Sequence, residues 1–152
     1  MLELHNECIL LDLKANSKEG VLRELAEAVH DQCVSISTEE LTKVLMDREE
    51  VGSTGMGNGV AIPHGKLPGI KRTTICFGRS AIGVNFDAID NHPVQLFVMI
   101  LSPVGTANEY LKSLARVSNL LKHEKNRELL LSMDSKENIR SLFNEQKNQP
   151  QP

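Results

Sequence analysis

Residues 94–101 have the sequence VQLFVMIL and form an almost continuously apolar stretch. A strand that is apolar on both sides is typical of a sheet whose two faces are both covered by helices. Shorter apolar runs predict further strands at about 73–77, at 60–62 and at 11–13, where two leucines flank Asp12. Together these runs predict a layered sandwich of the α/β or α+β type.

Apolar residues with the helical period lie before and after the predicted strands. They predict a helix over about 18–32 and a second helix that opens at Ser37, where Glu40 completes a capping box. The C-terminal third carries three apolar helical stripes, formed by Leu111, Leu114, Ala115, Ser118 and Leu121, by the leucines at 129–131, and by Ile139, Leu142 and Phe143. We expect Asp134 with Glu137 to cap the last of these helices.

The 152 residues suit one domain, which we expect over 1–145, followed by a polar and frayed tail at 146–152. No apolar run approaches the ~20 residues that span a bilayer, and the N-terminus lacks the layout of a signal peptide. Three cysteines, Cys8, Cys33 and Cys76, lie far apart, so they indicate neither a disulfide framework nor a zinc site. We therefore expect a cytoplasmic domain that does not insert into the membrane.

The charge of the chain excludes one further class of partner. With 17 basic and 20 acidic side chains the formal net charge is −3, and the isoelectric point is near 6.0. A nucleic-acid-binding surface would need a cluster of basic residues to meet the phosphates. No such cluster is present in the sequence, so we expect no nucleic-acid partner.

The segment with the strongest chemical signal is the glycine-rich run GSTGMGNG at 52–59. Half of its residues are glycine, which disfavours a regular element. A short strand follows, and Pro63 ends it, so we expect His64 to lie where the chain turns outward. Gly65 then leaves open space for an approaching reactant.

The residues around His64 suit an anion. The glycine-rich run can turn backbone N–H groups and the hydroxyls of Ser53 and Thr54 toward one anion-sized cavity. Arg48 can add a fixed charge that matches phosphate geometry, and Lys66 can add another. A histidine in this setting can act as a general base or as a nucleophile toward phosphorus, and the second role is favoured because the partners of a hydrolytic histidine are absent.

Other phosphate-binding and catalytic motifs do not fit the glycine-rich run. Asn58 stands where a Walker lysine would be, and Val51 excludes a nucleophile elbow around Ser53. Nucleotide binding and serine hydrolysis are therefore disfavoured. Asn58-Gly59 also suits a plain hairpin turn, with His64 merely capping a strand, and on spacing alone this interpretation stands equal to the functional one.

The thirteen residues 52–64 resemble the signature of enzyme IIA domains of the fructose–mannitol class, from the bacterial phosphoenolpyruvate-dependent phosphotransferase system. The likeness extends over nearly the whole chain, through 11–13, Arg48-Glu49, 86–90 and Ser102-Pro103. A single domain without attached membrane or IIB segments is most similar to the nitrogen-regulatory branch of that family.

This resemblance implies a three-layer α/β/α sandwich with a mixed central sheet, and a histidine that a small histidine phosphocarrier protein phosphorylates. His64 matches the phosphoryl acceptor, Arg48 the active-site arginine, and Thr54, next to Ser53, a loop residue beside the phosphohistidine. Tyr110 stands where the family commonly has a second histidine. A tyrosine can donate one hydrogen bond to a phosphoryl oxygen but does not become cationic near neutral pH. No cofactor or metal is implied.

We therefore expect a phosphocarrier with a regulatory role in nitrogen or general metabolism. One alternative is a sugar-specific IIA subunit that passes the phosphate to a separate IIB protein. The other is an interaction module that binds regulatory targets without turnover, for which Tyr110 is the best support. A hydrolase comes last, because a base–nucleophile pair is missing.

The remaining candidates are given structural roles. His30 and Cys33 have a spacing compatible with metal ligation, but a plain helix surface is favoured because two further ligands are lacking. Turns or solvated ends are expected for His5, His92, His123, Asp87, Asp90, Glu49 and Glu50. Met56 is expected to be an exposed apolar contact for the phosphodonor.

Overall fold

β6 (Val94–Pro103) lies at the centre of a mixed sheet in the computed structural model, which describes residues 4–30, 36–105 and 107–145. The sheet has the order β1-β5-β6-β3-β2, and β4 also pairs with β6. Its other strands are β1 (Ile9–Leu10), β2 (Gly55–Gly57), β3 (Val60–Ala61), β4 (His64–Leu67) and β5 (Thr74–Val84). β5 is antiparallel to β6, whereas β3 and β4 run parallel to it.

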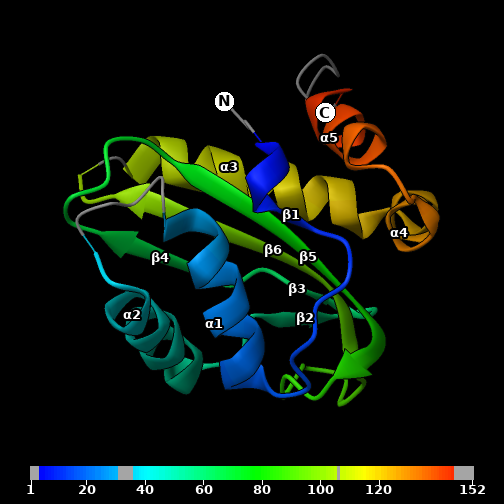
Figure 1. The fold of residues 1–152 in the computed structure, drawn as a ribbon, viewed down its shortest axis with the longest axis horizontal. Helices are drawn as coiled ribbons and strands as arrows, with labels where there is room; N and C mark the ends of the chain where they lie inside the picture. The colour runs from blue at the N-terminus through cyan, green and yellow to red at the C-terminus, as the bar shows by residue number, and fades with distance from the viewer. Residues whose placement is uncertain (1–3, 31–35, 106, 146–152) are drawn as a thin grey trace.

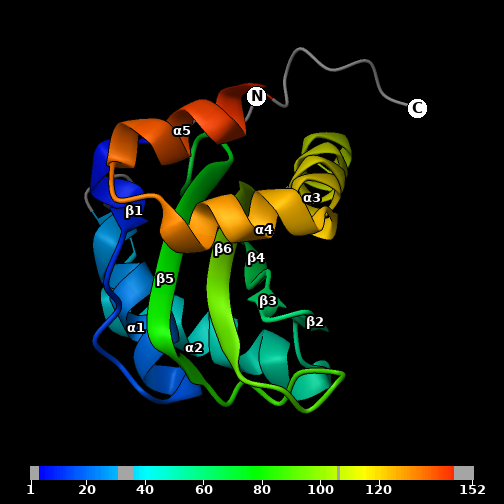
Figure 2. The same ribbon diagram turned by 90° about the vertical axis from the view of Figure 1, so that its right-hand side faces the viewer.

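Helices cover both faces of this sheet. In Figure 1, α1 (Lys18–Val29) and α2 (Thr38–Val51) lie in front of it, with α3 (Ala107–Lys122) on the opposite side. Figure 2 shows α4 (Glu124–Ser132) in front of β5 and β6, with α1 and α2 behind them. α5 (Lys136–Glu145) contacts the short 3-10 helix η1 (Asn6–Cys8). The predicted three-layer α/β/α sandwich with a mixed sheet is confirmed.

The apolar stretch that predicted a doubly covered strand behaves as expected. Every residue of β6 except Gln95 is buried. The predicted start of α2 also holds, since the hydroxyl of Ser37 accepts the backbone N–H of Glu40 at 3.1 Å. A buried strand and a local cap depend on short-range pattern, which is why the sequence predicts them.

Three local predictions are wrong. The first strand is Ile9–Leu10, not 11–13, because it pairs with Phe77 and Gly78 of β5. The glycine-rich run is not free of regular structure, since it contains β2. The cap of α5 is Ser135, whose hydroxyl accepts the N–H of Asn138 at 3.3 Å, and not Asp134. The predicted tail at 146–152 lies outside the described residues.

The apolar stripe predicted for α3 does not coincide with the face of the helix that is buried. Leu111 is 60% exposed, although Leu121 is buried as expected. The buried residues of this helix are Ser113, Val117, Leu120 and Leu121. α3 therefore has apolar residues on two faces, one against the sheet and one that carries the exposed Leu111.

The guanidinium group of Arg79, on β5, donates hydrogen bonds to backbone carbonyls of segments that are distant in the sequence. Its Nε donates to the Leu11 carbonyl at 3.0 Å, and Nη1 donates to the Leu130 and Met133 carbonyls at 2.9 and 2.6 Å. The last two carbonyls belong to the end of α4, where positive charge is favourable. A half-buried cation thus satisfies three backbone acceptors.

We predict that Arg79→Ala lowers the free energy of unfolding by about 3 kcal/mol, because carbonyls lose a charged donor in a water-poor place. Urea denaturation followed by circular dichroism measures this change. The matched control is Arg23→Ala, whose side chain is 45% exposed and should change stability by less than about 0.5 kcal/mol. Equal stability of the two variants would contradict the prediction.

Candidate functional site

His64 begins β4 immediately after Pro63 separates that strand from β3. The Pro63 carbonyl accepts the N–H of Ile100 at 2.9 Å, and His64 pairs with Ile100 in parallel register. The expectation that the chain turns outward at His64 is therefore wrong, because the second strand continues along β6. Gly65 also differs from expectation: a Cβ there would lie 3.4 Å from Val44 of α2, so its size serves helix packing.

The imidazole of His64 is half-buried and has a fixed tautomer. Its Nδ1 lies 2.7 Å from the Ile62 carbonyl oxygen. A carbonyl oxygen can only accept, so Nδ1 carries the proton and Nε2 keeps its lone pair. The pKa of His64 is lowered, chiefly by burial and also by the Arg48 charge, while the Ile62 bond and the Glu49 charge oppose that shift. The ring is therefore neutral at neutral pH.

A pocket of about 640 Å³ opens beside this ring. Its walls come from the end of α2, the glycine-rich run, the connection between β5 and β6, and α3. The residues that line it are Arg48, Ser53, Thr54, Gly55, Met56, Ile62, His64, Asp87, Ile89, Leu114 and Ser118. Four residues predicted from the sequence, Arg48, Ser53, Thr54 and His64, thus share one cavity although they come from α2, the loop after it and β4.

Arg48 and Tyr110 flank His64 from two helices. Arg48 donates from Nη1 to the Gly52 carbonyl at 2.8 Å, which fixes the guanidinium at the end of α2. The Tyr110 ring lies 5.7 Å from the His64 ring, centroid to centroid. Burial raises the pKa of Tyr110, and the Arg48 charge opposes this shift. The ammonium of Lys66 lies 5.2 Å from the centre of the Tyr110 ring, so positive charge gathers here.

The hydroxyls of Ser53 and Thr54 are used inside the protein, contrary to expectation. Ser53 Oγ donates to the Phe86 carbonyl at 2.6 Å, and Thr54 Oγ1 donates to Glu49 Oε2 at 2.5 Å. The N–H groups of Thr54 and Gly55 are bonded to the side chains of Glu49 and Ser53. The expected cradle of backbone N–H groups is therefore not formed by these two residues, because closer acceptors take them.

Glu49 was expected at a solvated helix end, and this prediction is wrong. The residue is 6% exposed and pairs with Lys18, whose Nζ lies 3.0 Å from its Oε1. Glu50 is exposed, as predicted. The spacing of Glu49 contained the missed signal: it lies four residues after Leu45 and eight after Leu41, on the buried face of α2.

The hairpin interpretation of Asn58-Gly59 is confirmed, and it coexists with the pocket. β2 and β3 are antiparallel, and Asn58 has a positive φ of 57° in the turn. Asp90 holds this turn by accepting the Asn58 N–H at 3.1 Å, and it also accepts the His92 N–H. The bond from His92 is the main reason that the pKa of Asp90 is lowered. Asp90 is thus a turn residue, as expected.

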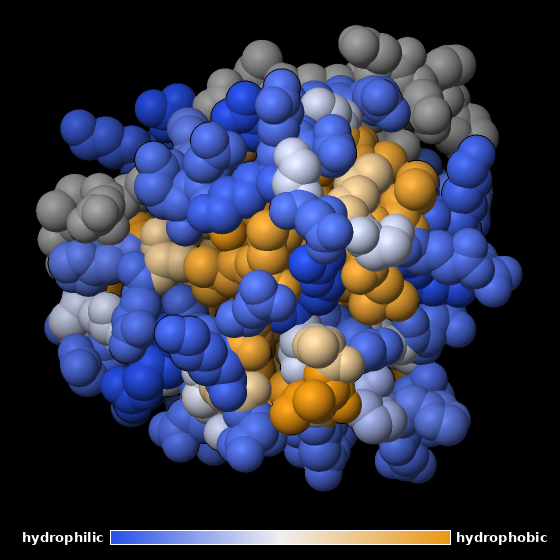
Figure 3. Space-filling view, turned by 45° about the vertical axis from the view of Figure 1, so that its right-hand side comes forward, coloured by the Kyte–Doolittle hydropathy of each residue, from blue (hydrophilic) through white to orange (hydrophobic). Residues whose placement is uncertain are grey.

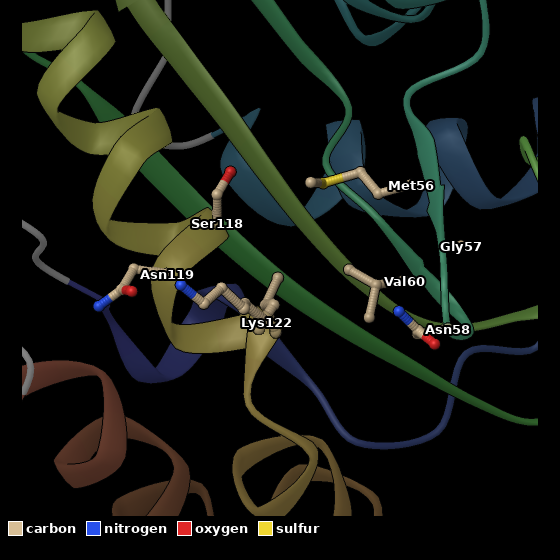
Figure 4. Close-up of a pocket in the computed structure, with 8 residues that line it drawn as sticks. Met56, Gly57, Asn58, Val60, Ser118, Asn119 and Lys122 are labelled. Carbon is tan, nitrogen blue, oxygen red and sulfur yellow. The ribbon is translucent and has the colours of Figure 1, made fainter.

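A second pocket, of about 480 Å³, lies between the β2–β3 hairpin and α3 (Figure 4). Met56 and Ser118 line both pockets. Figure 4 shows the Met56 side chain extending from the hairpin toward Ser118 on α3. Met56 is 49% exposed, as predicted, so it forms an apolar ridge between the two cavities.

Exposed apolar residues surround the His64 pocket. Met56 and Ile89 line it and are exposed, and Leu114 is half-buried in the pocket wall. Figure 3 shows apolar residues open to the surface among hydrophilic ones on the side turned toward the viewer. Such patches are typical of protein–protein contact sites.

The other histidines lie outside this pocket. His92 is in an exposed turn, and His123 lies between α3 and α4. Cys33, which has a metal-compatible spacing from His30, lies outside the described residues. Within residues 4–30, 36–105 and 107–145 there is no group of three or more histidine, cysteine or acidic side chains placed to hold a metal. The same residues contain no helix long and apolar enough to span a bilayer.

Comparisons with known proteins agree with the geometry. The model of the family described as "Phosphoenolpyruvate-dependent sugar phosphotransferase system, EIIA 2" matches residues 3–146. A nitrogen regulatory protein of Bradyrhizobium diazoefficiens is 40% identical over 118 residues, which are 78% of this chain and 76% of the relative. A fructose-specific EIIA component of Haloferax volcanii is 34% identical over 139 residues, covering 91% and 90%.

Among solved structures, the nitrogen regulatory protein IIA-Ntr from Neisseria meningitidis superimposes with a TM-score of 0.86. It is 34% identical in sequence, and the match covers 91% of this chain and 94% of that one. The likeness therefore includes the whole sandwich around the pocket.

Proposed function

Since the chain belongs to the EIIA type-2 family of the phosphoenolpyruvate-dependent sugar phosphotransferase system, we propose that His64 is its phosphoryl acceptor. The family is one of phosphoryl carriers. The observation that carries the assignment is the 2.7 Å bond from Nδ1 to the Ile62 carbonyl, which leaves the Nε2 lone pair of a neutral ring available. We propose a small histidine phosphocarrier protein as the donor.

The transfer is a single displacement at phosphorus. Nε2 of His64 attacks the phosphorus carried by the imidazole of the donor, the new N–P bond forms, and the donor's N–P bond breaks. The donor's ring leaves with the electron pair of that bond, while His64 Nδ1 keeps its proton and donates it in the hydrogen bond to the Ile62 carbonyl. Arg48 offsets the charge on the transferred oxygens. The apolar rim of Met56 and Ile89 supplies the contact for the donor protein.

The regulatory role follows from what phosphorylation changes. Phosphorylation turns a neutral ring into a group with a net negative charge, since the phosphoryl oxygens carry roughly −1.5 to −2 charges at pH 7 and the ring that keeps its Nδ1 proton carries about +1. Partners can therefore distinguish the two forms by charge at this surface without refolding of the domain. The 40% identity to a nitrogen regulatory protein supports this role. The 34% identity to a fructose-specific EIIA component supports the alternative, transfer onward to a IIB protein.

One experiment tests the acceptor and the role together. The protein is incubated with phosphoenolpyruvate and the general proteins of the phosphotransferase system, and the intact mass is measured. We expect one acid-labile phosphate, which fragmentation assigns to the peptide that contains His64. A sugar-specific IIB protein is then added: retention of the label supports regulation, and rapid loss supports the sugar-specific alternative. A wild-type protein that gains no phosphate contradicts the proposal.

The lowered pKa of His64 predicts its titration. Burial disfavours the imidazolium form, so the neutral nucleophile persists below the ordinary histidine pKa of about 6.5. We expect the NMR signals of the His64 ring to titrate with a midpoint below that value, and phosphorylation to slow only as the pH falls through it. A midpoint above about 6.5 would contradict the described environment of the ring.

Tyr110 is predicted to help with one hydrogen bond only. Tyr110→Phe should slow phosphorylation about tenfold, the worth of one bond to a charged oxygen. Tyr110→His should accelerate it, because an imidazole can become cationic next to the phosphoryl group. Initial rates with a limiting concentration of phosphodonor measure both changes. Equal rates for all three proteins would show that Tyr110 makes no contact with the phosphoryl group.

A further inference from the structure

A buried carboxylate next to a site proposed for a phosphoryl group needs a physical reason. The Glu49 side chain is 2% exposed and follows directly after Arg48. An unpaired buried carboxylate is costly, and its charge would repel the phosphoryl oxygens. Lys18 at the start of α1 offsets both the cost of burying the carboxylate and its repulsion of the phosphoryl oxygens, because the Lys18 ammonium lies 3.0 Å from Glu49 Oε1.

Both oxygens of the Glu49 carboxylate accept hydrogen bonds from Thr54, which lines the pocket. Oε1 accepts the Thr54 N–H at 3.1 Å in addition to facing Lys18, and Oε2 accepts the Thr54 hydroxyl at 2.5 Å. Two bonds to one residue fix the orientation of the backbone at Thr54. Glu49 therefore defines where the wall of the pocket stands relative to His64.

The ammonium of Lys18 extends the same network to a second wall. Its Nζ donates to the Phe86 carbonyl at 3.3 Å and lies 4.8 Å from the centre of the Phe86 ring. The same carbonyl accepts the Ser53 hydroxyl. One ion pair thus joins α1, the end of α2, the glycine-rich run and the connection that carries Asp87 and Ile89.

We infer that Glu49, neutralised by Lys18, is a positioning residue for phosphoryl acceptance, which it serves by holding the pocket wall at Thr54 in the geometry that transfer requires. The inference rests on the proposed function of His64. Glu49 touches no reacting atom, because its oxygens are occupied by Thr54 and Lys18. Its effect falls on the rate of transfer within the complex and leaves donor docking, which uses the exposed apolar rim, unchanged.

The chain offers a matched pair of variants. Glu49→Gln and Glu50→Gln remove the same charge from adjacent positions of α2, one buried and one exposed. We expect Glu49→Gln to lower kcat about 100-fold, the scale of a misplaced site, with KM for the purified phosphocarrier nearly unchanged. Glu50→Gln should stay within about twofold in both constants.

An NMR titration supplies a readout that a loss of stability alone would not give. The Glu49 charge raises the pKa of His64, so Glu49→Gln should lower the His64 midpoint further, whereas Glu50→Gln should leave it at the wild-type value. If Glu49→Gln does not fold, Thr54→Val removes only the hydroxyl bond and should slow transfer, and Thr54→Ser should restore it.

The outcomes separate the two proposals. Wild type that takes up no phosphate ends the proposed function, and the inference falls with it. Labelled wild type together with an unchanged kcat in Glu49→Gln overturns the inference alone. A higher KM with unchanged kcat also overturns it, because Glu49 would then act in docking.

Discussion

The variant His64→Ala is expected to gain no phosphate under conditions in which the wild-type protein is fully labelled. The structure gives the reason: the Nε2 lone pair of a neutral, tautomer-fixed imidazole is the proposed nucleophile, and alanine removes it. Neighbouring hydroxyls do not replace it, because those of Ser53 and Thr54 already donate to Phe86 and Glu49. Intact-mass measurement before and after mild acid treatment gives the result directly.

The matched control for this variant is His92→Ala, which removes a histidine from an exposed turn. It should be labelled like wild type. Circular dichroism confirms that both variants are folded. Phosphate on folded His64→Ala would mean that another residue accepts it, and the assignment of the site would be wrong.

Arg48→Ala is expected to slow phosphorylation about 100- to 1,000-fold, the usual cost of removing one charge-stabilising donor from a reaction site. The Arg48 charge reaches the His64 ring, since it lowers the pKa of that ring, and the guanidinium is fixed by its bond to Gly52. Because Tyr110 cannot supply a second positive charge, Arg48 has to offset more of the negative charge on the phosphoryl oxygens. Single-turnover labelling with excess phosphodonor measures the rate.

Two comparisons make the Arg48 result specific. Arg48→Lys keeps the charge but loses the bidentate hydrogen bonding of the guanidinium. Its phosphorylation rate should therefore lie between those of Arg48→Ala and the wild-type protein. Lys43→Ala removes an exposed positive charge from the same helix and should leave the rate unchanged. A wild-type rate in Arg48→Ala would exclude it from the transfer step.

The parts of the fold that depend on short-range pattern could be predicted from the sequence. β6 follows from one apolar run, and the start of α2 follows from Ser37 and Glu40. The extent of β4 could not be predicted, because HGKL has little strand pattern and is fixed by pairing with β6. The stripe on α3 was misplaced because the helix is apolar on two faces and periodicity does not say which face meets the sheet.

In the candidate site, too, the features set by local sequence could be predicted and those set by long-range contacts could not. The segment around His64 indicates the site, and the structure brings Arg48, Ser53 and Thr54 to the same pocket. The sequence does not show which acceptor a hydroxyl will find, so the internal bonds of Ser53 and Thr54 were missed. The partner of Glu49 was missed for a similar reason: Lys18 is 31 positions away along the chain and meets it only through the packing of α1 on α2.

The ring nitrogen of His64 that carries the phosphate can be identified by NMR. The wild-type protein, labelled with nitrogen-15 and phosphorylated, is examined by NMR for coupling between phosphorus and the ring nitrogens. We predict that phosphorus is bonded to Nε2 of His64, while Nδ1 keeps its proton toward the Ile62 carbonyl. Phosphorus on Nδ1, or on any residue other than His64, would contradict it.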